Sequence, residues 1–219
     1  MESTRILLAD DHDLMRRGLK VLVESHPGWQ VCGEAHTGWE AVKKSIELRP
    51  NIAIVDITMP ELNGLEAARR IRKASPPTEI LIFSVHYSDQ LIRDVLDADV
   101  QGYVVKSDSD RDLIGAIEAL SEHKPFFTPR ASELILNHFG PRSEPEPDGT
   151  EEPVERPTAR EREMIQLLAE GKTTREAAAA LGISVKTAET HRANVMRKLQ
   201  IHSVTNLVRY AVRNCIIEP

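Results

Sequence analysis

The chain has 219 residues, of which 28% are charged and 41% hydrophobic, with a formal net charge of −6 at pH 7. This composition excludes fibrous and disordered classes, and the lack of an apolar run of about 18 residues excludes a membrane-spanning helix. The two cysteines, Cys32 and Cys215, lie far apart, so neither a disulfide framework nor a cysteine metal site is expected, and the protein is expected to be cytoplasmic.

The charge is distributed unevenly along the chain. Residues 1–154 carry a net charge of −10, and residues 155–219, with 11 Lys and Arg against 7 Asp and Glu, carry +4. An acidic part followed by a mildly basic part indicates two modules with different partners, and nucleic acid is a candidate for the second. Ordinary scatter in composition explains a charge of +4 equally well.

The first 125 residues alternate between short apolar runs and longer segments of helical period. The runs are rich in Ile and Val, as strands buried on both faces are; they are Ile6–Ala9, Val31–Ala35, Ile52–Val55, Ile80–Phe83 and Gly102–Val105. The first helical segment is marked by Leu14, Leu19 and Leu22. Five strand–helix repeats predict an α/β fold with a doubly wound, five-stranded parallel sheet of the flavodoxin-like kind.

The next segment, residues 126–157, is expected to connect two domains. A helix is predicted at about Pro129–Phe139 and is followed by Pro141–Pro157, which holds five prolines and six acidic residues. Such a segment buries too little apolar surface to offset the entropy of ordering it, so we expect an extended, acidic linker. The predicted domains are therefore 1–125 and 158–219.

The second domain is predicted to be small and entirely helical. Helices are expected over Ala159–Glu170, Thr174–Leu181 and Val204–Asn214, and a fourth begins at the N-cap Ser184 and runs to about Leu199. A short helix, a tight turn at a glycine and a longer helix are typical of the helix-turn-helix motif.

Carboxylates follow two strands of the predicted sheet. Asp10 and Asp11 come after the first strand and Asp56 after the third, and the ends of neighbouring parallel strands lie close together. Three anions in one crevice repel one another, and no basic residue adjoins them in sequence. A hard divalent cation with oxygen ligands solves this problem, which predicts a Mg²⁺ site.

Two further polar residues end the remaining strands. Ser84 follows the fourth strand and Lys106 the fifth. A single Asp after a strand is usually a turn or helix-cap residue, but this set fits phosphoryl transfer to a carboxylate. Asp56 would be the nucleophile, and Lys106 would bind a phosphoryl oxygen.

Residues 1–125 resemble the receiver domain of two-component response regulators. The motifs are L-L-A-D-D-H (Leu7–His12), V-D-I-T-M-P-E-L-N-G (Val55–Gly64), S-V-H (Ser84–His86) and G-Y-V-V-K (Gly102–Lys106). The resemblance implies that Asp56 accepts a phosphoryl group from a cognate sensor histidine kinase. It also implies Mg²⁺ ligands at Asp10, Asp11, Asp56 and the Thr58 carbonyl, and a switch pair of Ser84 and Tyr103. An aromatic residue at position 103 fits simple packing as well.

The predicted helix after Ser184 has one buried and one exposed face. At 100° per residue, Ala188, Val195 and Leu199 form the buried stripe, and the opposite side is small, polar and basic. Such a helix can enter the major groove of DNA. Its basic residues suit phosphate contacts or, alternatively, a merely solvated face; they are Lys186, Arg192, Arg197 and Lys198.

Residues 158–213 resemble the LuxR/NarL-type helix-turn-helix domain. The motifs are T-A-R-E-R-E-M-I-Q-L-L-A-E-G-K (Thr158–Lys172), L-G-I-S-V-K-T-A-E-T-H-R (Leu181–Arg192), and the K-L and H-S pairs that follow. The resemblance implies base contacts from Glu189, Thr190 and Ala193, and backbone contacts from Lys186, Thr187 and His191; Arg197 is expected at the DNA because it is one of the basic residues on this face. It implies a dimer surface at Val204, Leu207 and Val208, which fit an intradomain core equally well.

These features together favour a NarL/FixJ-type response regulator. Phosphorylation of Asp56 would shift the receiver and free or dimerise the second domain on double-stranded promoter DNA. One alternative is a Mg²⁺-dependent phosphohydrolase of the haloacid dehalogenase kind, although Thr58 stands where such enzymes carry a second Asp. Another is a DNA-binding regulator that does not respond to phosphate. Apart from its own phosphorylation and dephosphorylation, no enzyme activity is expected.

Overall fold

The computed structural model describes residues 3–85, 87–107, 110–129, 131–133, 135 and 156–218. The chain divides into two compact units, Met1–Gly140 and Pro141–Pro219, and each is described by itself. Most of the predicted linker, residues 141–155, lies outside the described residues. Among the described helices, none has the length and apolar character needed to cross a membrane.

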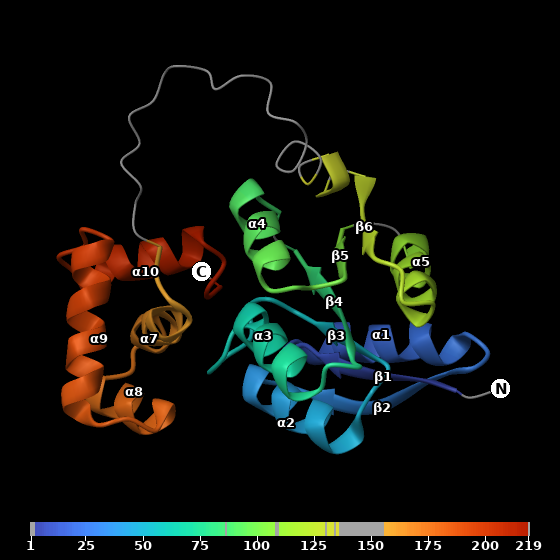
Figure 1. Ribbon diagram of the computed structural model, residues 1–219, viewed down its shortest axis with the longest axis horizontal. Helices are drawn as coiled ribbons and strands as arrows, with labels where there is room; N and C mark the ends of the chain where they lie inside the picture. The colour runs from blue at the N-terminus through green and yellow to red at the C-terminus, as the bar shows by residue number, and fades with distance from the viewer. Residues whose placement is uncertain are drawn as a thin grey trace. The chain divides into compact units, whose positions relative to one another are not determined.

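The first unit contains a parallel sheet with the strand order β2-β1-β3-β4-β5-β6 (Figure 1). The strands are β1 (Thr4–Ala9), β2 (Trp29–Ala35), β3 (Ile52–Val55), β4 (Glu79–Ser84), β5 (Gly102–Val105) and β6 (Phe126–Phe127). The doubly wound fold is confirmed, and all five expected strands are present. The sheet also contains a sixth strand, β6, so the predicted count of five is wrong. Phe126 pairs with Gly102 and Phe127 with Tyr103, and a strand of two residues is too short to give a periodic pattern in sequence.

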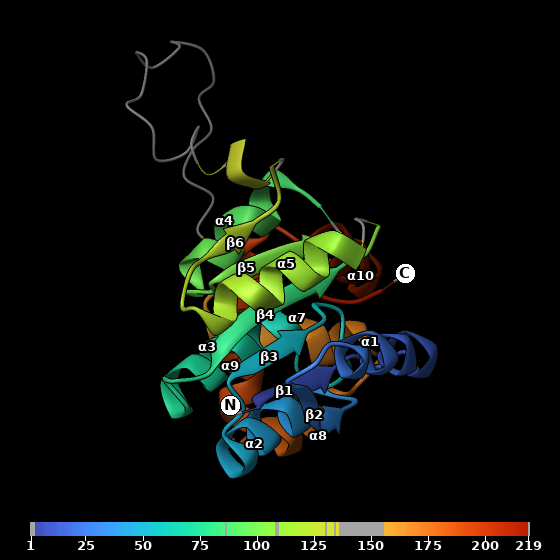
Figure 2. The ribbon, with the colours of Figure 1, turned by 90° about the vertical axis from the view of Figure 1, so that its right-hand side faces the viewer.

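Within the described residues of this unit, five helices cover the sheet. They are α1 (Asp13–Ser25), α2 (Gly38–Leu48), α3 (Gly64–Ala74), α4 (Asp89–Asp97) and α5 (Asp110–Ser121). Side chains of α1 and α5, among them Leu19 and Ile117, form one core cluster with the sheet residues Ile6, Ile54 and Leu81, so these two helices share one face of the sheet (Figure 2). Leu14, which marked the helical period in sequence, is 85% exposed.

The described part of the second unit, residues 156–218, contains helices α7 (Ala159–Ala169), α8 (Thr174–Leu181), α9 (Val185–Lys198) and α10 (Val204–Arg213). Thr158 and Thr173 form capping boxes at the starts of α7 and α8. Gly182 ends α8 with φ of +65°, a left-handed conformation that favours glycine. Of the helix predicted at about Pro129–Phe139, residues 129, 131–133 and 135 are helical, and the remaining positions lie outside the described residues.

Candidate functional site

The carboxyl ends of β1 and β3 bring the two central aspartates together. Ala9 pairs with Val55 in the parallel ladder, so Asp10 and Asp56 leave their strands at the same level, and the Asp56 amide donates to the Ala9 carbonyl at 2.8 Å. Both aspartates are buried. One side-chain ligand atom from each of Asp10, Asp11, His12 and Asp56 lies within 4.8 Å of the others. The predicted convergence of the three aspartates is therefore present.

Lys106 connects the two buried aspartates. Its Nζ lies 2.8 Å from Asp10 Oδ2 and 2.8 Å from Asp56 Oδ2, and the lysine side chain is 6% exposed. The backbone amide of Lys106 donates to the Ser84 carbonyl at 2.8 Å, which continues the pairing of β4 with β5 up to the site. One ammonium group thus contacts two carboxylates that belong to different strand ends.

Burial and charge act in opposite directions on this pair. Burial raises the pKa of Asp56 above its usual value, and the nearby Lys106 ammonium only partly offsets this. Burial alone would lower the pKa of Lys106, but attraction to Asp56 and Asp10 outweighs it and raises that pKa. The lysine therefore stays protonated, and it is positioned to stabilise negative charge on either aspartate.

The donor set fits a hard divalent cation. Three carboxylates face one ammonium group, which leaves an excess of about two negative charges when all are ionised. Carboxylate oxygens are the ligands that Mg²⁺ prefers, whereas the His12 nitrogen suits transition metals better. The Asp-rich group is therefore suited to hold Mg²⁺, as the resemblance seen in the sequence implies.

Arg16 is a component of this region that sequence reasoning missed. Its buried guanidinium donates to the Asp10 carbonyl at 2.8 Å, to Asp13 Oδ1 at 2.5 Å and to Glu34 Oε2 at 3.1 Å. The contacts place a second cation beneath the loop that carries Asp10. Little in the sequence indicates this role, because Arg16 is five residues further along the chain than Asp11. Only the first turn of α1 brings its side chain back to the loop.

The remaining predicted receiver residues are buried near the strand ends. Ser84 is the last residue of β4 and Tyr103 lies on the adjacent strand β5; both side chains are fully buried. Thr58 and Met59, in the loop after Asp56, are also buried. The Asp56 carboxylate accepts a hydrogen bond from the Ile57 amide at 2.8 Å, which fixes its orientation at the start of this loop.

Helix α9 presents the predicted polar face to solvent. Ala188 and Val195 are buried in the core of the second unit, with Leu199 packed against it, as the period predicted. The Ser184 hydroxyl accepts from the Thr187 amide at 3.1 Å, which confirms the predicted N-cap. The predicted DNA-facing residues are exposed except for His191, which is half-buried; the exposed ones are Lys186, Thr187, Glu189, Thr190, Ala193 and Arg197.

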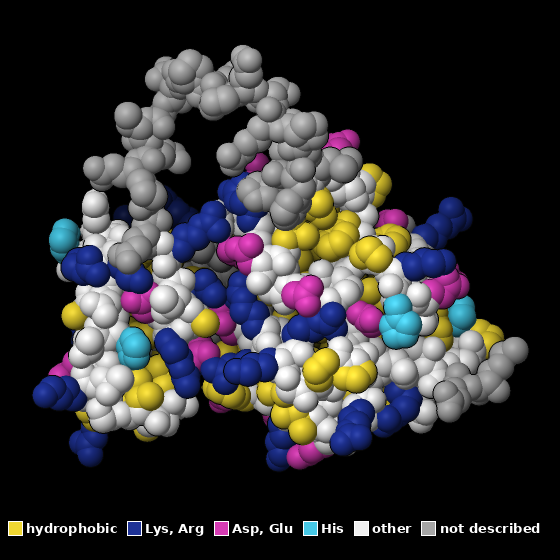
Figure 3. Space-filling view, in the orientation of Figure 1, with side chains coloured by type: hydrophobic (Ala, Val, Ile, Leu, Met, Phe, Trp, Pro, Cys, Tyr) yellow, Lys and Arg dark blue, Asp and Glu magenta, His cyan; other side chains and the backbone are white. Residues whose placement is uncertain are grey.

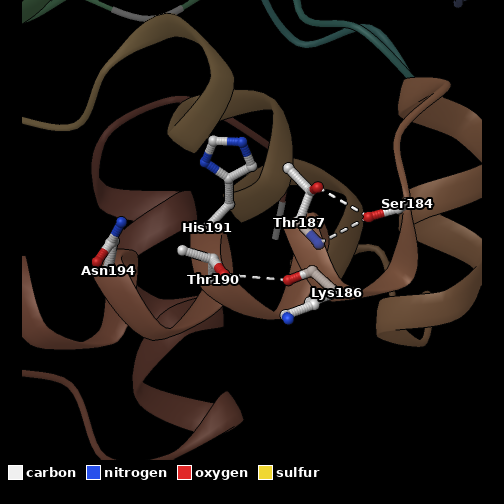
Figure 4. Close-up of a pocket in the computed structure, with 6 residues that line it drawn as sticks. All are labelled: Ser184, Lys186, Thr187, Thr190, His191 and Asn194. Carbon is white, nitrogen blue, oxygen red and sulfur yellow. Dashed lines mark hydrogen bonds between the residues drawn. The ribbon is translucent and has the colours of Figure 1, made fainter.

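A hollow of about 290 Å³ lies along this face of α9. Figure 4 shows its lining residues, which are Ser184, Lys186, Thr187, Thr190, His191 and Asn194. The lining contains hydroxyl, amide, imidazole and ammonium groups and no carboxylate, which suits contact with anionic oxygens. Lys and Arg side chains also stand out on the visible face of the second unit (Figure 3).

One residue of the second unit differs from its predicted role, and the structure decides between two roles for another. Lys198, expected at phosphate, has an 11% exposed side chain whose Nζ binds Glu161 Oε2 at 3.0 Å, since the helical period turns it toward α7. Leu207, for which a dimer surface and an intradomain core were both open, is 1% exposed and belongs to the core of the unit. Val204 is 51% exposed and Val208 half-buried, so only these two remain available to a partner.

Comparison with known proteins finds a matching family for each of the two units. Residues 6–118 match the response regulator receiver domain family, and residues 158–211 match the LuxR family of bacterial regulatory proteins. A receiver joined to a helix-turn-helix unit of this type defines the class of phosphorylation-dependent, DNA-binding transcription regulators rather than classical enzymes.

Similarity over the full length identifies the family within this class. The chain is 30% identical over 214 residues to the response regulator protein VraR of Staphylococcus aureus, which covers 98% of this chain and 99% of VraR. The chain therefore belongs to the two-component response regulators of the NarL/FixJ type.

Solved structures show the same architecture. A two-component response regulator of the LuxR family from Aurantimonas sp. SI85-9A1 is 34% identical, with a TM-score of 0.60 over 63% of this chain and 98% of that one. RcsB from Salmonella enterica serovar Typhimurium, bound to the promoter rprA in the presence of the phosphomimetic BeF3−, has 24% identity and a TM-score of 0.66 over 95% of this chain and 98% of that one. This second likeness concerns the fold alone.

Proposed function

We propose that Asp56 is the phosphoacceptor and that its phosphorylation controls binding of α9 to promoter DNA. The observation that carries this proposal is the position of Lys106 Nζ, 2.8 Å from both Asp10 and Asp56. A cation held between two aspartates is suited to neutralising the negative charge on the oxygens of a phosphoryl group that is transferred to one of them.

Each residue of the acidic pocket has a defined part in the proposed transfer. Asp10, Asp11, Asp56 and the Thr58 carbonyl would hold Mg²⁺, which neutralises phosphoryl charge and orients its oxygens when bound. A carboxylate oxygen of Asp56 forms a bond to phosphorus while the bond from phosphorus to a histidine nitrogen of the cognate sensor kinase breaks. Lys106 binds a phosphoryl oxygen. Ser84 and Tyr103 form the switch pair that responds to the phosphorylation of Asp56.

The second unit would bind double-stranded promoter DNA. Glu189, Thr190 and Ala193 would face base edges, while Lys186, Thr187, His191 and Arg197 would lie at the phosphates. The hollow along α9, whose lining includes Lys186, Thr187 and His191 and no carboxylate, supports the proposed phosphate contacts. Val204 and Val208 would contribute to a homodimer formed after phosphorylation. A DNA-binding role implies a cytoplasmic protein, and residues 126–157 would connect a receiver of residues 1–125 to a DNA-binding domain of residues 158–219.

The test is binding of the full chain to DNA duplexes selected by the chain from a random library. With acetyl phosphate and MgCl2, affinity should rise at least tenfold, and Asp56→Asn should abolish the increase. Glu24→Gln, which removes an exposed acid on α1, is the matched control and should respond like the parent chain. Equal affinity with and without phosphodonor in the parent chain would contradict the proposal.

A further inference from the structure

Helix α9 carries a single acidic residue, Glu189, on a face that is otherwise basic or neutral. The side chain is exposed. Lys186 and Arg192 stand three residues to either side, within reach of an ion pair along a helix, yet among the described residues neither forms one with Glu189. Arg192 Nη1 instead donates to Thr174 Oγ1 at 3.0 Å. The carboxylate is therefore left without a partner of its own on the described surface.

The neighbouring polar groups of α9 are already engaged by the helix. The Thr190 hydroxyl donates to the Lys186 carbonyl at 3.0 Å, and the Thr187 hydroxyl lies 2.8 Å from the Ser184 hydroxyl. Ala193 offers no polar side-chain atom. Glu189 thus provides the strongest uncommitted hydrogen-bond acceptor among the residues proposed to face the bases, and an ionised carboxylate has no hydrogen to donate.

A carboxylate close to DNA is repelled by the phosphates, and hydrogen bonds that it accepts from a base can offset this repulsion. In the major groove the base donors are the N4 amino group of cytosine and the N6 amino group of adenine. Adenine presents its N7 acceptor beside N6, and this lone pair repels the second carboxylate oxygen, whereas the cytosine edge has no acceptor of its own there. We propose that Glu189 reads a cytosine by accepting a hydrogen bond from its N4 amino group.

This inference rests on the proposed DNA-binding function, and one selection experiment separates the two. The full chain, treated with acetyl phosphate and MgCl2, selects duplexes from a random library, and the Glu189→Ala and Glu189→Gln variants select in parallel. Because Glu189 is exposed and Ala and Gln are good helix formers, both variants should fold. Lys186→Ala is the comparison variant, since loss of a phosphate contact weakens binding evenly across sequences.

The parent chain should select a cytosine at one position of each half-site, with other bases there binding about 5- to 100-fold more weakly. Glu189→Ala should lose this preference while keeping the rest of the site, Glu189→Gln should shift it toward adenine, and Lys186→Ala should retain it. Identical selected sequences from the parent and Glu189→Ala would overturn the inference while leaving the DNA-binding function intact. Failure of the parent to enrich any duplex would contradict the function itself, and the inference with it.

Discussion

Lys106 is the residue on which the electrostatics of the acidic pocket depend. It faces Asp10 and Asp56 at 2.8 Å each, and all three side chains are nearly inaccessible to solvent. Removing one partner of a buried ionic cluster leaves the remaining charges uncompensated, which is more costly than the loss of the contact itself.

The Lys106→Met substitution should therefore destabilise the first unit by about 3–5 kcal/mol. Both tryptophans, Trp29 and Trp39, lie in this unit, so urea unfolding followed by tryptophan fluorescence reports on it. MgCl2 should restore more stability to the variant than it adds to the parent chain, because the variant pocket holds more uncompensated negative charge. An equal effect of MgCl2 on both proteins would argue against a metal at these aspartates.

Sequence reasoning located Asp10, Asp11, Asp56, Ser84 and Lys106 because parallel strands end at one edge, and a residue that follows a strand must lie at that edge. It missed Arg16, whose contact with the Asp10 carbonyl depends on how the first turn of a helix is oriented. Lys198 was misassigned because its contact is with Glu161, a residue 37 positions away on another helix, and such packing leaves no local pattern.

At the scale of secondary structure, the loop between β3 and α3 fixes the position of Asp56. A Cβ atom added at Gly64 would lie 1.8 Å from the Asp56 carbonyl oxygen, and the Gly64 amide donates to the Ile57 carbonyl at 2.7 Å. Only a residue without a side chain allows this close approach of α3 to the strand end.

Gly64→Ala should accordingly destabilise the first unit by about 3 kcal/mol, because the loop must shift to admit a methyl group. Gly18→Ala is the matched control on α1, where an added Cβ has no atom within 4 Å; it should stabilise the unit by up to about 1 kcal/mol. Tryptophan fluorescence during urea unfolding measures both. Equal stabilities of the two variants would refute the close-approach argument.

In the second unit, Glu161 ties the start of α7 to the end of α9. Its Oε2 accepts from the Thr158 amide at 2.8 Å and from Lys198 Nζ at 3.0 Å. Burial by itself would raise the pKa of Glu161, but these hydrogen bonds outweigh it and hold the pKa below the usual value of 4.5. The stabilisation is therefore complete above pH 4.5 and is lost as pH falls through the lower pKa of the folded state.

Glu161→Gln should cost the second unit roughly 1.5–3 kcal/mol at pH 7, as expected for hydrogen bonds that involve a charged group. The difference from the parent chain should shrink as pH falls below 4.5. Far-UV circular dichroism during urea unfolding measures it, with tryptophan fluorescence as the internal control for the first unit. A difference that is the same at pH 7 and pH 3.5 would contradict the role of the ionised carboxylate.

The elements themselves show where sequence patterns succeed and where they fail. The buried strands and the four helices of the second unit were predictable because their apolar period and their N-caps, such as Ser184, are local features. Strand β6 was not, since two residues carry no period and their pairing with Gly102 and Tyr103 is a tertiary contact. The face of α10 was ambiguous because Val204, Leu207 and Val208 have similar chemistry and differ only in what packs over them.

At the scale of the whole molecule, the proposed homodimer would use the exposed part of α10. Val204→Asp should therefore weaken self-association of the phosphorylated chain at least tenfold, with a change in stability within about 0.5 kcal/mol, as for other surface substitutions. Leu207→Ala, one turn further along, should instead cost about 2–5 kcal/mol of stability because it opens a cavity in the core. Sedimentation of phosphorylated protein distinguishes the two effects. Unchanged self-association of Val204→Asp would exclude this surface.

The account depends most on Asp56 being the residue that takes up phosphate with the help of a metal at the acidic pocket. The most direct measurement is peptide-resolved mass spectrometry of the full chain after incubation with acetyl phosphate, with MgCl2 or with EDTA. We expect a single phosphoryl group on the peptide that contains Asp56, formed in MgCl2 and at most slightly in EDTA, and none in Asp56→Asn. A phosphoryl group on another residue, or equal labelling in EDTA, would contradict the account.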